Sequence, residues 1–163
     1  MLNELVSDVC SKLEKAKLEY MLSGSVAMGI YTMGRMSWDV DFVISLKEED
    51  IEVFLSLFQK RYFLQPNVIK QEIKREGMFN IIDEQSGFKV DFIIKKSTTF
   101  REEEFTRRKK IDFFGKKIYV VALEDLILSK LIWIQQLQSE KQLRDISMLL
   151  LNKDLDKNYL LNG

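Results

Sequence analysis

Two aspartates separated by one residue stand inside an apolar stretch of this sequence. Asp39 and Asp41 belong to residues 38–45, Trp-Asp-Val-Asp-Phe-Val-Ile-Ser, whose β-branched and aromatic residues are typical of a strand. Because side chains alternate between the faces of a strand, both carboxylates point the same way, roughly 6–7 Å apart. Burying two such groups without a partner is costly. A divalent cation is the simplest compensation, because magnesium takes carboxylates together with phosphate oxygens and water.

A third aspartate repeats this pattern further along the chain. Asp91 lies in residues 88–94, Phe-Lys-Val-Asp-Phe-Ile-Ile, between apolar neighbours. If this strand pairs beside residues 38–45, the three carboxylates converge. Two cations could then clamp the attacking and leaving oxygens of an in-line displacement. The alternative is that all three aspartates lie on the polar face of an exposed sheet edge.

A glycine-serine pair marks a turn from a strand directly into a helix. Gly24 permits close backbone approach, and Ser25 can cap the start of the helix. The backbone amides of such a turn suit a phosphate group. The alternative is an ordinary helix cap with no ligand.

The order of these features carries a family resemblance. Residues 20–45 contain a strand, Gly24-Ser25, a helix, and then Gly34-Arg35-Met36-Ser37 before the two aspartates. This order resembles the signature of the nucleotidyltransferase superfamily, most closely the abortive-infection-type nucleotidyltransferase toxins and their uncharacterised relatives. The resemblance implies an α+β fold, in which a mixed β-sheet is flanked by helices and followed by a C-terminal helical pair.

The resemblance also implies roles for the individual residues. Gly24 and Ser25 would contact the triphosphate of a nucleotide. Asp39 and Asp41 would bind magnesium or manganese. Asp91 would complete the metal site and help to deprotonate the attacking hydroxyl. These residues would together transfer a nucleoside monophosphate to a hydroxyl acceptor and release pyrophosphate.

Three further polar residues are candidates for binding the nucleotide. Arg35 matches a family position near the phosphates, although it could instead pair with a surface carboxylate. Lys130 lies in the middle of an apolar helical stripe, and a buried lysine needs an anionic partner, unless it reaches solvent at the end of the stripe. Ser129-Lys130-Leu131 and Arg144-Asp145-Ile146 resemble the C-terminal motifs of the same toxin-like family. There the lysine touches phosphate and the aspartate supports it, whereas Asp145 could instead pair with Lys141.

Hydrophobic periodicity and turn residues predict the elements that must position these side chains. The expected domain spans residues 1–163, with a core at about 18–121. We predict helices at residues 2–17, 26–33, 48–61, 123–137 and 140–151. We predict strands at residues 19–23, 38–45, 68–74, 78–83, 88–95 and 117–121, with turns at 86–87 and 114–116. Residues 100–110 are highly charged and are expected to be solvated.

Composition excludes several function classes. The chain has no histidine and a single cysteine, which removes histidine-based catalysis, internal disulfides and zinc clusters. It has 25 basic and 25 acidic residues, so no net positive field attracts nucleic acid. No signal peptide or membrane-spanning apolar run is visible, and we expect a cytoplasmic protein.

Two rival functions remain open. One is a non-catalytic antitoxin or regulatory module that keeps the fold, with a toxin or antitoxin as its partner. The other is a metal-dependent glycosyltransferase using Asp39 and Asp41, which would explain neither Gly24-Ser25 nor Asp91. For the favoured transferase, the acceptor could be RNA, a protein or a small molecule.

Overall fold

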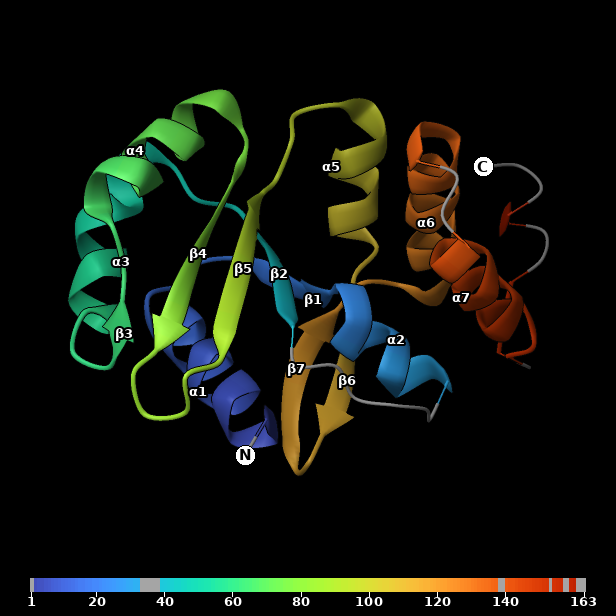
Figure 1. The fold of residues 1–163 in the computed structure, drawn as a ribbon, viewed down its shortest axis with the longest axis horizontal. Helices are drawn as coiled ribbons and strands as arrows, with labels where there is room; N and C mark the ends of the chain where they lie inside the picture. The colour runs from blue at the N-terminus through green and yellow to red at the C-terminus, as the bar shows by residue number, and fades with distance from the viewer. Residues whose placement is uncertain (1, 33–38, 138–139, 153, 157–158, 161–163) are drawn as a thin grey trace.

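The computed structural model describes residues 2–32, 39–137, 140–152, 154–156 and 159–160 (Figure 1). The first half of the chain contains α1 (Leu2–Lys15), β1 (Tyr20–Ser23), α2 (Gly24–Thr32), β2 (Val40–Ile44), η1 (Glu48–Asp50), α3 (Ile51–Phe58), β3 (Tyr62–Phe63) and α4 (Pro66–Arg75). The second half contains β4 (Met78–Asp83), β5 (Lys89–Ile94), α5 (Thr99–Thr106), β6 (Lys109–Phe113), β7 (Lys116–Val120), α6 (Leu123–Leu137) and α7 (Glu140–Leu150).

The described strands form one seven-stranded mixed sheet in the order β3-β4-β5-β2-β1-β7-β6. Strand β2 runs parallel to β5, and β1 runs parallel to β7. The remaining neighbours, β1 with β2 among them, are antiparallel. A mixed sheet flanked by helices confirms the predicted α+β class.

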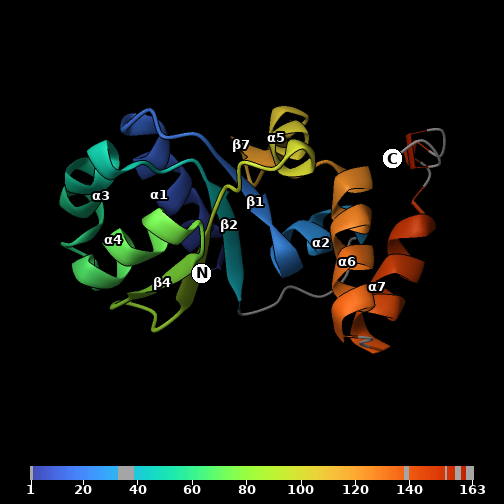
Figure 2. The same ribbon diagram turned by 90° about the horizontal axis from the view of Figure 1, so that it is seen from above.

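The hydrophobic core lies between the sheet and helices α1 and α3, which sit together on one side of it (Figure 2). Alternation along β2 buries Val40, Phe42 and Ile44 on this face. Phe92 stacks on Phe42 at a ring distance of 5.8 Å, and Phe54 from α3 meets Phe92 edge-on at 5.5 Å. The residues that alternate with these core residues along β2 and β5 therefore point to the other face of the sheet.

Two predictions for the middle of the chain are wrong. Residues 68–74 form part of helix α4 and not a strand. Pro66 starts this helix in its first turn, where the missing N–H costs nothing, and Ile69 and Ile73 are buried one helical turn apart. Residues 100–110 are not simply solvated, because α5 occupies most of them and buries Phe105.

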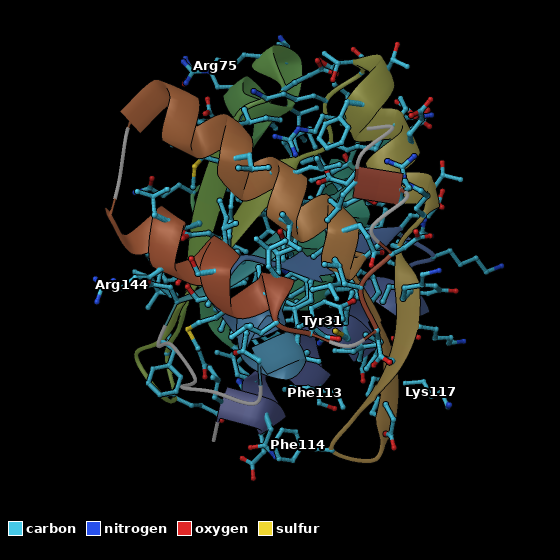
Figure 3. The ribbon with its side chains drawn as sticks, turned by 90° about the vertical axis from the view of Figure 1, so that its right-hand side faces the viewer. Tyr31, Arg75, Phe113, Phe114, Lys117 and Arg144 are labelled. Atoms are coloured by element: carbon cyan, nitrogen blue, oxygen red, sulfur yellow. The ribbon has the colours of Figure 1, made fainter. Side chains whose placement is uncertain are left out.

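The predicted C-terminal helical pair is confirmed, and it packs against α2 (Figure 3). The Tyr31 hydroxyl near the end of α2 donates a 2.8 Å hydrogen bond to the Val121 carbonyl just before α6. The Asn152 side chain, which follows α7, donates to the Tyr31 carbonyl at 2.9 Å. None of the helices in the described part of the chain is long and apolar enough to cross a membrane.

Candidate metal and phosphate site

The two central strands of the sheet bring two of the predicted aspartates together. Strands β2 and β5 pair in parallel with Asp41 directly opposite Asp91. Both strands lie in the interior of the sheet order, and Asp91 is buried while Asp41 is partly buried. The predicted pairing of residues 38–45 with residues 88–95 is therefore confirmed. The alternative of an exposed sheet edge does not hold for this pair.

The electrostatics of the pair show that it is under-neutralised. Burial raises the pKa of the Asp41 carboxyl to about 6, and the charge of Asp91 and a hydrogen bond to it add to the effect. The charge of Asp39 raises this pKa further, whereas a hydrogen bond from the Ser25 backbone N–H lowers it. Two adjacent carboxyls thus resist being ionised together, which is the situation that a bound cation relieves.

An unsatisfied oxygen marks where a cation would fit. Asp91 Oδ1 is buried and has no hydrogen-bond partner within the described residues. Lys89 Nζ lies 3.8 Å from it, which is beyond hydrogen-bond distance. Buried polar atoms are nearly always satisfied by a partner. Carboxylate oxygens are also the ligands that magnesium prefers, so the residues present fit the metal that the sequence implied.

Asp39 stands apart from this pair. It is exposed and directly precedes β2. Its charge raises the pKa of Asp41. Within the described ranges, however, no three acidic or cysteine side chains lie close enough together to bind a metal ion. The structure therefore brings two of the three predicted metal ligands together, and a ligand role for Asp39 stays a prediction.

The glycine-serine turn adjoins the carboxyl pair. Strand β1 passes into α2 at Gly24 without an intervening loop, and Ser23 pairs directly with Asp41. Gly24 has φ +62°, and a Cβ atom there would lie 2.2 Å from Asp41 Oδ2. Only glycine fits both this backbone conformation and this contact. Because α2 begins here, its free amides and its positive dipole end face the carboxylates.

This arrangement combines two binding functions at one place. Carboxylate oxygens that suit a cation lie beside backbone amides that suit phosphate oxygens. A metal-bound polyphosphate is the ligand that needs both at once. Asn80 on β4, directly opposite Asp91, is exposed to solvent.

Comparison with known proteins decides the family. The profile described as "Nucleotidyltransferase domain" matches residues 2–120. This chain belongs to the nucleotidyltransferase domain family. The match includes Gly24, Ser25, Asp39, Asp41 and Asp91, whereas Lys130 and Asp145 lie beyond it. None of the curated proteins compared matches this nucleotidyltransferase domain.

Solved structures share the fold of this nucleotidyltransferase domain. An antigenic nucleotidyltransferase-like protein from Paracoccidioides brasiliensis matches with a TM-score of 0.60 at 18% identity, covering 91% of this chain and 74% of that one. The lincosamide antibiotic adenylyltransferase LnuA, bound to lincomycin, matches with a TM-score of 0.62 at 14% identity, covering 91% and 96%. ANT(2″)-Ia in complex with adenylyl-2″-tobramycin matches with a TM-score of 0.59 at 10% identity, covering 99% of this chain and 93% of that one. At these identities the likeness shows the fold alone.

Lys130 of the nucleotidyltransferase domain forms a buried ion pair across the C-terminal helices. Its Nζ lies 3.0 Å from Asp145 Oδ2 on α7, and the two residues are 8% and 3% exposed. The alternative that Lys130 reaches solvent is therefore wrong. A phosphate contact for Lys130 stays a prediction, and Arg35 lies outside the described residues.

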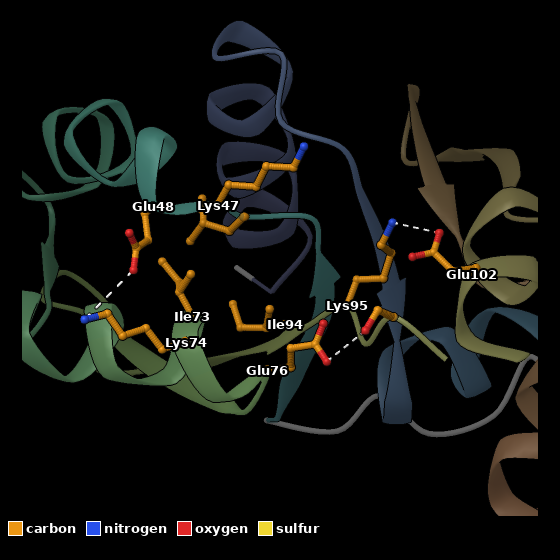
Figure 4. Close-up of a pocket in the computed structure, with 10 residues that line it drawn as sticks. Lys47, Glu48, Ile73, Lys74, Glu76, Ile94, Lys95 and Glu102 are labelled. Atoms are coloured by element: carbon orange, nitrogen blue, oxygen red, sulfur yellow. Dashed lines mark hydrogen bonds and ion pairs between the residues drawn. The ribbon is translucent and has the colours of Figure 1, made fainter. Parts of the chain in front are cut away.

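A cavity lined by residues of several elements lies elsewhere on the molecule (Figure 4). It has a volume of about 540 Å³ and lies past the ends of β2 and β5. Its charged walls largely neutralise one another, because Lys95 pairs with Glu102 at 3.1 Å and Lys74 with Glu48 at 4.0 Å. Neither Asp41 nor Asp91 lines it, so we assign it no part in the metal and phosphate site.

Two polar residues near Asp91 were missed by the sequence reasoning. Lys89 precedes Asp91 by two residues on β5 and so shares its face. Asn80 on β4 lies directly opposite Asp91. Strand alternation could have identified Lys89. The position of Asn80, however, depends on the register between β4 and β5, which cannot be predicted from a local sequence pattern.

Proposed function

We propose that this domain transfers a nucleoside monophosphate from a magnesium-bound nucleoside triphosphate to a hydroxyl acceptor. The observation that carries the proposal is the in-register Asp41–Asp91 pair beside the Gly24 turn. Membership of the nucleotidyltransferase family supports the reaction type. The metal, the nucleotide and the acceptor are inferred from the chemistry of the site.

The chain's own residues divide the work of binding. Asp41 and Asp91 would hold the cation, and Asp39 would add a third oxygen at the edge. The cation would supply charge neutralisation and polarise the phosphoryl group under attack. The amides of Gly24 and Ser25 would bind the terminal phosphates, with Lys130 and Arg35 as further candidates for phosphate contact.

Metal and nucleotide should bind together. The Ser25 N–H donates to the Asp41 carboxylate in this structure. A cation would compete for that carboxylate, and the amide would then be free for a phosphate oxygen. Triphosphate without metal would instead meet the negative charges of Asp41 and Asp91 at close range.

Proton transfer would fall to Asp91. The chain has no histidine, so a carboxylate is the best remaining base. Oδ1 of Asp91 would face the cation, so the other oxygen of this carboxylate would accept the proton from the attacking hydroxyl. Its partner Asp41 would stay on the metal.

The wider biological role is also a proposal. The motif at Gly34-Arg35 and the Lys130–Asp145 pair favour the abortive-infection-type toxins as the subtype within the family. The antibiotic adenylyltransferases that share the fold offer small hydroxyl compounds as the alternative acceptor class. Both subtypes require the same nucleotidyl transfer.

Labelled nucleotides test this function. The purified protein would be incubated with magnesium, cell extract and, in turn, ATP, CTP, GTP or UTP labelled at the α-phosphate. We expect one nucleotide to pass label to an acceptor with release of pyrophosphate. The Asp41→Asn variant should pass none. Tight metal-dependent binding of a triphosphate without any transfer of label would contradict the proposed enzymatic activity and favour the non-catalytic regulatory module.

A further inference from the structure

The face of the sheet that carries Asp91 continues sideways onto β4 and β3. In Figure 1 these strands lie in front, with α1 and α3 behind them. The register places Asn80 opposite Asp91 and Ile82 opposite Lys89. Phe63 on β3 then lies opposite Ile82. Directly opposed residues share a face with Cβ atoms about 4.5–5.5 Å apart, so these side chains form a continuous surface beside the carboxyl pair.

This surface is apolar and open. Phe63 is 52% exposed and Ile82 is 37% exposed. Met78, which lies opposite Ile93 on the other side of Asn80, is 49% exposed. Their neighbours on the opposite face, including Phe79 and Ile81, are buried in the core. The exposed apolar side chains of β4 therefore take no part in packing the core, which lies on the opposite face of the strand.

The position of this surface relative to the proposed phosphate site indicates which substrate would contact it. From α2 outward, the sheet presents Ser23, Asp41, Asp91 and Asn80 on successive strands, spaced about 4.8 Å apart. The phosphates would lie at the Ser23 end, at the start of α2. In an in-line displacement the attacking oxygen approaches opposite the leaving group. The acceptor therefore approaches from the Asn80 side.

We propose that Asn80, Ile82 and Phe63 form the acceptor subsite, and that the acceptor is a small hydroxyl compound with an apolar face. This inference rests on the proposed transferase function. The acceptor's O–H would attack the α-phosphorus, forming a new O–P bond as the bond to pyrophosphate breaks. Its proton would pass to the Asp91 carboxylate. Asn80 would orient the hydroxyl with its amide, while Ile82 and Phe63 cover the apolar part of the compound.

Charge on this surface argues against a nucleic acid as the acceptor. Binding a phosphate backbone needs several lysines or arginines. Among the described residues that these registers place on the face, Lys89 is the basic one. It already forms an ion pair with Asp91. The chain as a whole carries as many acidic as basic residues.

Variants on this face separate the acceptor from the nucleotide. The probe is the small-molecule ultrafiltrate of a cell extract, offered with the labelled triphosphate and magnesium; the retained RNA and protein are offered separately. We would compare Asn80→Ala and Ile82→Ser with wild type, because both positions are exposed and should tolerate the change. Val53→Ser is the matched control, since Val53 is a 45% exposed apolar residue on α3.

We expect wild-type protein to label a compound in the ultrafiltrate. Asn80→Ala and Ile82→Ser should raise the ultrafiltrate concentration needed for half-maximal labelling by about tenfold or more. Their affinity for magnesium and triphosphate, measured by calorimetry, should stay within about twofold. Val53→Ser should behave as wild type.

Other outcomes overturn the inference in distinguishable ways. Label that enters RNA or protein instead of the ultrafiltrate rejects the acceptor class. Label in the ultrafiltrate with unchanged half-maximal concentrations in both variants rejects the subsite. In both cases the transferase function itself stands. A wild-type protein that neither binds triphosphate nor labels any fraction rejects the function and this inference with it.

Discussion

Replacing Asp41 by asparagine should stabilise the protein in the absence of metal. The pKa of Asp41 stands at about 6, against an ordinary value of 3.8, chiefly because the group is buried and faces Asp91. At about 1.36 kcal/mol for each pH unit of difference, its ionised form costs the folded state about 3 kcal/mol. Asparagine keeps the shape and can still accept the Ser25 N–H, but it carries no charge. We expect a net gain of about 1–3 kcal/mol.

The gain should depend on pH in a defined window. Below about pH 3.8 the carboxyl is protonated in both folded and unfolded protein, so Asp41 contributes no difference. Between that value and about pH 6 the unfolded chain ionises first, and wild-type stability falls as the pH rises. Above this window the penalty is complete. The difference between Asp41→Asn and wild type should therefore grow through the window and level off near pH 7.

Thermal melts with a chelator present test this reasoning. For a chain of this size, a gain of about 1–3 kcal/mol corresponds to an increase of about 2–12 °C in Tm at pH 8. Glu52→Gln is the control, because Glu52 is an exposed carboxylate on α3. A lower Tm for Asp41→Asn, or an increase that is the same at pH 5 and pH 8, would refute the electrostatic account and point to a structural role for the charge.

Three further predictions concern the neighbouring elements. Lys130→Met should lower the free energy of unfolding by about 3–5 kcal/mol in denaturant titrations, because Asp145 would remain buried without its cation; unchanged stability would mean that the pair is not structural. Gly24→Ala should lower the free energy of unfolding by at least about 1 kcal/mol more than Gly115→Ala does, and it should also weaken nucleotide binding. Both glycines have positive φ, but only a Cβ atom added at Gly24 would meet Asp41. Equal losses of unfolding free energy in the two variants would contradict the close packing at Gly24. Asp91→Asn should bind triphosphate within a few-fold of wild type in calorimetry, yet lose transfer by about a hundredfold or more; equal transfer rates would remove Asp91 as the base.

The central strands could be predicted from sequence because their patterns are local. Alternation of apolar residues with aspartates located β2 and β5 to within two residues. Two apolar strands with matching aspartates also suggested their pairing, which the structure confirms. The Gly24–Ser25 turn was predictable for the same reason, since the change from strand to helix occurs within adjacent residues.

Other features depend on contacts between distant segments. Residues 68–74 have β-branched residues that favour a strand, but packing of Ile69 and Ile73 against the core makes them helical. The partner of Lys130 lies on another helix, 15 residues away, so helical spacing could not identify it. The subsite beside Asp91 depends on the pairing of β4 with β5, which depends on the whole sheet.

Titration with manganese tests the central claim most directly. Manganese can replace magnesium at oxygen ligands, and its electron paramagnetic resonance signal falls when the ion is bound. The wild-type protein should bind manganese weakly alone and much more tightly with a non-hydrolysable triphosphate present. The Asp41→Asn/Asp91→Asn double variant should lose this cooperative binding while staying folded. If the double variant binds manganese and the triphosphate as tightly as wild type, the carboxyl pair is not the metal site and the proposed function has no structural basis.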